Sequence, residues 1–312
     1  MELRGRVLVV GNAVLDLVVA PLLKPPPQGR TIKVDLSKLF VGGCGVNTAL
    51  VLARLGVETS LVGPIGDDAL ASLLLSRLKK AGVNTDGLIV CENVDTSVTV
   101  VLVWEDGERS FLHSGGNSGR LNGEHLDGLD AAEVDHIHIG GALLLTGVEA
   151  EAWARTLKRF KQAGATTSLD PAWDARGLWL KTLEPALPHI DYLFPSKVEA
   201  EMLTGESVPD KAGESLVNMG VSKAVVKLGE EGSLLVERGN ILRQRAFKAE
   251  VVDTTGAGDA YDAGFIAALM QKKADNEAMR WGAAAGALAV SDYGATSSLH
   301  SREQLLSLLS RV

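Results

Sequence analysis

The chain has 312 residues, of which 46% are hydrophobic and 34 are glycine, so we expect one large domain with a well-filled core, with or without a small appendage. Its formal charge of −8 and the lack of any basic run argue against binding to nucleic acid or to a membrane surface. Two cysteines exclude a disulfide framework, and the first residues, MELRGRVLVVGNAVLD, contain no signal-peptide core. We therefore expect a cytoplasmic protein.

Short β-branched segments alternate with helical patterns along most of the chain. The predicted strands span residues 6–10, 60–62, 136–139, 166–169, 192–194 and 224–227. The predicted helices include residues 47–55, 69–80, 149–162 and 197–203. Alternation of this kind indicates βαβ units, and it therefore predicts an α/β fold whose mostly parallel sheet has helices on both faces.

Two segments interrupt the alternation. Residues 17–39 contain prolines that exclude a helix, and residues 95–113 have the pattern of a β-hairpin that turns at residues 105–107. We predict that these two insertions form one small β-sheet beside a main domain made of residues 1–16, 40–94 and 114–312. Residues 98–104 are apolar on both faces of their strand, so either a bound ligand or a second subunit is expected to cover them.

The segment VVDTTGAGDAYDAGF, residues 251–265, places a glycine-rich turn between a predicted strand that ends near Asp253 and an apolar helix that begins near Ala257. Free N–H groups and the helix dipole form an anion site at such a helix start. Asp259 lies in the first helical turn. It either complements the helix dipole or takes a proton from an alcohol while the anion site stabilises a phosphoryl group in transfer. The buried helix behind it favours the catalytic interpretation, because such a helix holds the geometry rigidly.

Three better-known glycine motifs are absent from the sequence. It contains no G-x-x-x-x-G-K-[ST] motif, which argues against a P-loop nucleotide triphosphatase. It has neither G-x-G-x-x-G after the first strand nor a G-x-S-x-G nucleophile elbow. None of these three motifs therefore accounts for the glycine-rich turn before Asp259.

Five segments identify a known family when they are taken in order. They are GNAVLDL, VGGCGVNTALVLARLG, LFPSKVEAEMLTG, VVKLGEEGSLL and DTTGAGDAYDAGF. They resemble the motifs of the ribokinase-like (PfkB-type) carbohydrate kinases, and the resemblance extends from residue 11 to about residue 298. It implies a three-layer αβα sandwich with a small β-sheet lid. It also implies ATP-dependent phosphorylation of a hydroxyl on a small polar substrate.

The resemblance assigns roles to residues around the substrate. Asp259 is expected to be the catalytic base. The implied anion hole consists of Gly256, Ala257 and Gly258. The implied substrate contacts are Asp16, Gly42, Gly43 and Asn47. Residue chemistry alone leaves two alternatives open, since Asp16 could cap a turn and Asn47 could cap the helix that follows it.

The resemblance also implies sites for the nucleotide and for two cations. The nucleotide-binding turn is expected at Lys227, Gly229 and Gly232. Glu199 matches a family glutamate that organises Mg²⁺ and phosphate through water, although Ser196 stands where the family motif has asparagine. A K⁺ ion beside the anion hole would be held mainly by backbone oxygens of Asp253, Thr255, Ala289, Gly294 and Ser298.

The acceptor is the least determined part of the function. The leading hypothesis is a kinase that acts on a monosaccharide, a ketose or a sugar acid. The alternatives are a nucleoside kinase of the same fold and a non-catalytic sugar-binding homologue. The segment DPAWDARGLW, residues 170–179, follows a predicted strand and is expected at the rim of the cleft. If a second lid covers residues 98–104, the protein is a homodimer.

Overall fold

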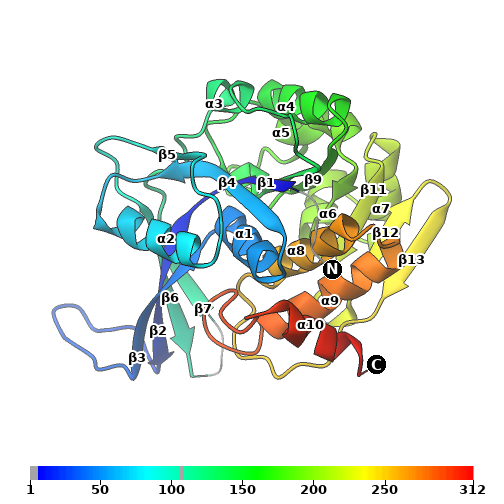
Figure 1. The fold of residues 1–312 in the computed structure, drawn as a ribbon. Helices are drawn as coiled ribbons and strands as arrows, with labels where there is room; N and C mark the ends of the chain where they lie inside the picture. Colours follow the sequence, from blue (N-terminus) through cyan, green and yellow to red (C-terminus); the bar gives the residue numbers. More distant parts are fainter. Residues whose placement is uncertain (1–5, 106–108, 312) are drawn as a thin grey trace.

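The computed structural model describes residues 6–105 and 109–311, which form two β-sheets flanked by helices (Figure 1). The strands of the larger sheet are β1 (Arg6–Gly11), β4 (Glu58–Ile65), β5 (Leu88–Val90), β8 (His136–Gly140), β9 (Thr166–Asp170), β10 (Tyr192–Leu193), β11 (Lys223–Lys227), β12 (Ser233–Glu237) and β13 (Asn240–Gln244). Their order across the sheet is β13-β12-β11-β10-β9-β8-β1-β4-β5. The strands from β11 to β5 pair in parallel, while β12 and β13 form an antiparallel edge.

Two layers of helices cover the two faces of this sheet. On one face lie α1 (Cys44–Arg54), α2 (Ala69–Lys80), α8 (Ala257–Met270), α9 (Asp275–Ala289) and α10 (Arg302–Leu309). On the other face lie α3 (Gly123–Asp127), α4 (Ala150–Gln162), α5 (Leu180–Leu183), α6 (Lys197–Thr204), α7 (Pro209–Asn218) and the 3-10 helix η2 (Glu184–His189). Each layer shares a buried hydrophobic core with the sheet. The predicted three-layer αβα sandwich is confirmed.

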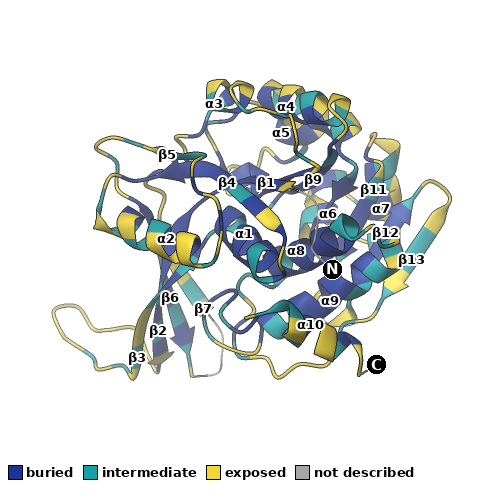
Figure 2. Cartoon of the chain, viewed as in Figure 1, coloured by how far each residue is buried: buried dark blue, intermediate teal, exposed yellow. Residues whose placement is uncertain are grey.

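The centre of the sheet is apolar on both sides, as expected for parallel strands. Val7 and Val9 of β1 belong to one core, whereas Leu8 and Val10 of the same strand belong to the other. Helix α8 is buried from Asp259 to Ala268 because it lies between α1 and α9 (Figure 2). This burial fixes the position of the first turn of α8.

The smaller sheet projects from the main body in Figure 1. Its strands are β2 (Val14–Leu22), β3 (Leu36–Gly42), β6 (Ser97–Trp104) and β7 (Arg109–Ser114), in the order β3-β2-β6-β7. The predicted small sheet is therefore present, and we call it the lid sheet. The predicted turn at residues 105–107 lies mostly outside the described residues.

The predicted strand before the glycine-rich turn is wrong. The segment between β13 and α8, residues 245–256, contains no strand. The N–H groups of Val252 and Asp253 both donate to the carbonyl of Val290, 2.8 and 3.2 Å away, at the end of α9. The residues are therefore held by a helix C-terminus rather than by a neighbouring strand.

None of the helices within residues 6–105 and 109–311 is long and apolar enough to cross a membrane.

Candidate active site

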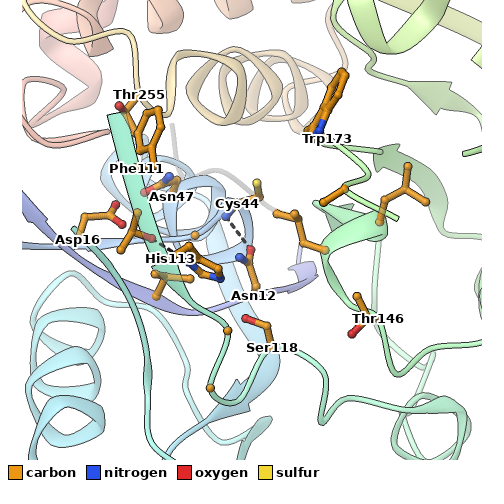
Figure 3. A pocket seen from close by; sticks show the side chains of 18 of the residues that line it. Asn12, Asp16, Cys44, Asn47, Phe111, His113, Ser118, Thr146, Trp173 and Thr255 are labelled. Carbon is orange, nitrogen blue, oxygen red and sulfur yellow. Dashed lines mark hydrogen bonds between the residues drawn. The ribbon is translucent and has the colours of Figure 1, made fainter. Parts of the chain in front are cut away.

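A cavity of about 620 Å³ opens between the lid sheet, the starts of α1 and α8, and the loops after β1, β8 and β9 (Figure 3). Ligands commonly bind at this carboxyl edge of parallel strands. Of the residues predicted for the site, six line the cavity: Asp16, Gly43, Asn47, Thr255, Gly256 and Asp259. The segment predicted at the cleft rim also lines it, through residues 173–176.

Asp259 lies in the first turn of α8 and is hydrogen-bonded to α1. Its Oδ2 atom accepts a 2.8 Å hydrogen bond from Nδ2 of Asn47. Burial raises the pKa of Asp259, and the negative charge of Asp170 acts in the same direction, while the Asn47 hydrogen bond opposes them. A carboxylate with a raised pKa is better suited to accept a proton from an alcohol.

Asn47 also presents an unused acceptor. Its Oδ1 atom is buried and has no hydrogen-bond partner among the described residues. Buried amide oxygens are normally paired, so this atom is available to a hydroxyl group of a ligand in the cavity. Asn47 does not cap α1, because the N-cap residue is Gly43.

Gly256 begins α8 with a left-handed backbone, φ +71°. A Cβ atom at this position would lie 2.8 Å from the Cβ of Ala295, so a side chain is excluded by both conformation and space. The next N–H groups, those of Ala257 and Gly258, belong to the first helical turn, although neither residue lines the cavity. The N–H group of Ala257 donates a long, 3.3 Å hydrogen bond to the carbonyl of Thr254. Because Gly256 has no side chain, an anion can approach this helix start closely.

Asp16 reaches the cavity from strand β2 of the lid sheet. Burial raises its pKa to about 6, while a hydrogen bond from Thr99 lowers it and the charges of Asp253 and Asp259 raise it further. Gly42 does not line the cavity, but a Cβ there would overlap the Asp16 carboxylate. Gly42 thus makes room for the Asp16 side chain.

Asn12 is a residue of the site for which no role was predicted. This residue follows β1 and lines the cavity, and its Oδ1 atom accepts a 2.9 Å hydrogen bond from the N–H group of Cys44 (Figure 3). The bond ties the loop after β1 to the start of α1. A polar residue that directly follows a central strand was the signal that could have identified Asn12.

Lys227, predicted to contact the nucleotide, lies beneath the start of α8 with its side chain 12% exposed, and it does not line the cavity. Its Nζ atom lies 2.5 Å from Asp170 and 3.2 Å from Asp262. Burial acts to lower the pKa of Lys227, but the two carboxylates raise it well above its ordinary value. One cation faces two carboxylates here, and burial raises the pKa of Asp262 well above its usual range. Lys227 is therefore charged and paired mainly with Asp170.

The other residues predicted for the nucleotide form the turn between β11 and β12. Gly229 and Gly232 flank this turn with positive φ angles of +62° and +102°. A Cβ at Gly232 would overlap the backbone carbonyl of Gln244. The turn lies outside the cavity described above.

Ser196 and Glu199 form a capping box at the start of α6. Glu199 Oε2 accepts a 2.7 Å hydrogen bond from the Ser196 N–H group, and Ser196 Oγ accepts a 3.3 Å bond from the Glu199 N–H group. Burial and the nearby charge of Asp170 raise the pKa of Glu199. Serine at position 196 thus has a local structural role.

The residues predicted to hold K⁺ converge beside the start of α8. The Asp253 carboxylate accepts hydrogen bonds from the N–H groups of Thr255, at 2.9 Å, and Gly294, at 3.0 Å. The Ser298 hydroxyl donates to the carbonyl of Ala289 at 3.0 Å. These contacts join the turn before α8 to the segment after α9.

Comparison with known proteins decides the family. The sequence matches the model of the pfkB family of carbohydrate kinases over residues 4–302. The chain belongs to this family. Ribokinase from Arabidopsis thaliana is 32% identical over 312 residues, which cover 96% of this chain and 80% of the relative. The ATP-dependent ribose-1-phosphate kinase of Halopiger xanaduensis is 30% identical over 94% of either chain.

The pfkB assignment agrees with the fold. The structure of Arabidopsis thaliana ribokinase complexed with ribose and ATP superposes with a TM-score of 0.82 and 28% identity, covering 98% of both chains. The pfkB protein described here is accordingly a phosphotransferase of the sugar and nucleoside kinase group, as the five sequence motifs predicted. Its acceptor is an alcohol group.

Proposed function

We propose that this kinase transfers the γ-phosphoryl group of ATP to a hydroxyl group of a small sugar, with Asp259 as the general base. The observation that carries the proposal is the position of Asp259, which lines the cavity in the first turn of α8 and is held there by Asn47. The Asp259 carboxylate takes the proton of the sugar hydroxyl as the hydroxyl oxygen bonds to the γ-phosphorus and the bond to ADP breaks. The backbone N–H groups of residues 256–258 stabilise the transferring phosphoryl group.

The substrate sugar is bound by polar groups on both sides of the cavity. The Asp16 carboxylate accepts hydrogen bonds from hydroxyl groups, and Oδ1 of Asn47 accepts another. Gly43 permits close approach of the sugar to the backbone, while Gly42 keeps the space that the Asp16 carboxylate needs. The lid sheet excludes water, which would otherwise compete for the phosphoryl group.

We expect the nucleotide and the cations near the N-terminus of α8, on the side away from the cavity proposed to hold the sugar. The turn at Gly229 and Gly232 is proposed to contact ATP, while Lys227 supports the phosphates electrostatically from beneath the first turn of α8. Glu199 fits Mg²⁺ through water, since Mg²⁺ retains several waters and needs few protein ligands. Magnesium would neutralise charge on the phosphates.

The convergence of residues at the α8 start also supports a K⁺ site. Backbone oxygens of Asp253, Thr255, Ala289, Gly294 and Ser298 are proposed to surround the ion. A bound cation there would stabilise the turn that forms the anion hole. A rise in thermal unfolding temperature with K⁺ but not with Na⁺ would support this site, and equal effects of the two ions would contradict it.

We also propose that the protein forms a homodimer through the face of the lid sheet that points away from the cavity. Strand alternation places Asp16, Thr99 and Phe111 on the face toward the cavity. The opposite face carries Leu17, Val19, Leu39, Val100, Leu102 and Leu112. Leu112 is 62% exposed in the single chain. Sedimentation should show a dimer that a Leu112→Lys substitution weakens, and a monomer at micromolar concentration would contradict the proposal.

A nucleoside kinase is the second candidate, and one observation favours it. Phe111 and Trp173 both line the cavity and are 54% and 53% exposed, so either ring could stack on a nucleobase. An ATP-consumption screen with Mg²⁺ and K⁺ over monosaccharides, sugar acids, polyols and nucleosides separates the two functions. Phosphorylation of sugars but not nucleosides supports the sugar kinase, and the reverse pattern supports the alternative.

A further inference from the structure

Arg176 is the one arginine or lysine among the described side chains that line the cavity. It belongs to the loop after β9. Its Nη1 and Nη2 atoms each lie 3.5 Å from a backbone carbonyl, those of Thr146 and Leu143 respectively. Both distances are at the limit for a hydrogen bond, so the guanidinium group is oriented by these carbonyls but retains donors for a stronger partner.

Arg176 is paired with the neighbouring carboxylate through one edge of its guanidinium group only. Asp174 Oδ1 lies 3.4 Å from Nε of Arg176, which is a long contact for an ion pair. The two Asp174 oxygens accept shorter hydrogen bonds from the backbone N–H groups of Arg176, Leu178 and Trp179, at 3.0, 2.7 and 2.8 Å. Burial acts to raise the pKa of Asp174, but these N–H groups and the charge of Arg176 hold it below its ordinary value. Asp174 thus caps its own loop and pairs with Nε of Arg176, while the two terminal nitrogens of Arg176 make only the long contacts to Thr146 and Leu143.

The cavity is electrostatically asymmetric. Figure 3 shows Trp173 and Thr146 on one side of the cavity, and Asp16, Asn47 and Thr255 on the other. Arg176 belongs to the first side through its contact with Thr146. The first side therefore carries one cation with its partner Asp174, whereas the second side carries the Asp16 and Asp259 carboxylates, which would repel an anion. A substrate with a negative group is therefore favoured in one orientation, with that group at Arg176 and a hydroxyl group toward Asp259.

We propose that Arg176 binds an anionic substituent, a carboxylate or a phosphate ester, on the sugar that this enzyme phosphorylates. This inference rests on the proposed function, because it names the class of acceptor for the same cavity. The planar guanidinium group matches carboxylate and phosphate oxygens in a two-point contact that a neutral sugar cannot make. The position of Arg176 also determines which end of the sugar faces the base.

Equilibrium binding tests the inference without requiring turnover. Calorimetry would compare glucose with glucuronate and gluconate, and ribose with ribose 1-phosphate, in the presence of Mg²⁺ and a non-hydrolysable ATP analogue. The wild type should bind at least one anionic sugar about 10- to 100-fold more tightly than its neutral partner. The Arg176→Gln substitution should remove most of that difference, and Arg176→Lys should retain part of it.

A control variant separates this role from a general loss of charge or fold. Arg155 makes an exposed salt bridge to Asp127, 3.1 Å long, away from the cavity, so Arg155→Gln should preserve the preference for the anionic sugar. If Arg176 only supports the 143–146 segment, Arg176→Gln would weaken the binding of neutral and anionic sugars equally, and the inference would be wrong. The inference would also be wrong if the wild type bound no anionic sugar more tightly than its neutral partner.

The same measurements distinguish this inference from the proposed function. The wild type could phosphorylate neutral and anionic sugars with equal efficiency, and Arg176→Gln could leave that ratio unchanged. This result would keep the kinase function and would contradict the role proposed for Arg176. Arg176-dependent binding of an anionic sugar without phosphoryl transfer to any acceptor would support the binding site and contradict the proposed reaction. The carboxylate and phosphate probes show which anion the site prefers.

Discussion

Asn47 and Asp259 are 212 residues apart in the sequence, yet Nδ2 of Asn47 lies 2.8 Å from Oδ2 of Asp259, so the starts of two helices share one hydrogen bond at the floor of the cavity. Each helix contributes its positive end, and the two side chains define the direction in which the carboxylate points. In the proposed reaction, this contact links the residues proposed to bind the sugar to the proposed base.

The Asn47–Asp259 hydrogen bond predicts a shift in the pH dependence of catalysis. The bond favours the ionised carboxylate, so Asn47→Ala should raise the pKa of Asp259 further. The acidic limb of the kcat–pH profile should then move upward by about 0.5–1 pH unit. The measurement is kcat at saturating sugar across the pH range, and an unmoved or downward-shifted limb would contradict the role assigned to Asn47.

Adding one methyl group at position 42 should weaken sugar binding. A Cβ at this position would overlap the Asp16 carboxylate, so Gly42→Ala should displace that side chain and raise the sugar KM by about tenfold or more. Gly128→Ala is the control, because a Cβ there has its nearest neighbour 3.6 Å away. If both variants bound sugar equally well, Gly42 would not be needed for the position of Asp16.

The raised pKa of Asp16 predicts weaker sugar binding in mild acid. Asp16 accepts hydrogen bonds from hydroxyl groups most strongly when ionised, and burial raises its pKa to about 6. The carboxylate is therefore mostly ionised above this pH and protonated below it. The sugar Kd should rise by about tenfold between pH 7.5 and pH 5. In the Asp16→Asn variant, affinity should be lower throughout and nearly independent of pH, and a persistent pH dependence would assign the effect to another group.

Removing the Lys227 ion pair should cost much more free energy of unfolding than removing a more exposed ion pair. Lys227→Met leaves the buried Asp170 carboxylate without its cation, so it should reduce the free energy of unfolding by about 3–5 kcal/mol. Lys161→Met, which breaks a partly exposed 2.7 Å pair with Asp191, should cost less than about 1 kcal/mol. Urea unfolding at neutral pH compares the two. Equal losses would show that the Lys227 pair is not a buried support of α8.

The sequence predicted those features that depend on local patterns. Helix α2 has the predicted bounds, residues 69–80, because its apolar positions recur with helical spacing and Asp68 caps its start. The helix starting at Ala257 and the lid sheet were also predicted, because their glycines, prolines and alternating apolar residues are local signals. Family motifs supplied Asp16, Asn47 and Asp259, which all line the cavity.

Features that depend on distant contacts were not predictable in the same way. The segment before α8 has β-branched residues like a strand, but its hydrogen bonds go to Val290 and Gly294, about forty residues later. Likewise, the charge of Lys227 gave no sign that folding would pair it with Asp170 and Asp262, 57 and 35 residues away. The orientation of Arg176 follows from the carbonyls of another loop. Only the folded chain brings these groups together.

The role proposed for Asp259 as acceptor of the sugar hydroxyl proton is tested by single-turnover phosphoryl transfer in the Asp259→Asn variant. The new amide is nearly the same size and can still accept the hydrogen bond from Asn47, but it cannot take up a proton at neutral pH. If Asp259 is the base, the transfer rate should fall by about 10²–10⁴-fold while sugar and ATP bind with nearly unchanged Kd. A transfer rate close to that of the wild type would contradict the assignment of Asp259 as the base.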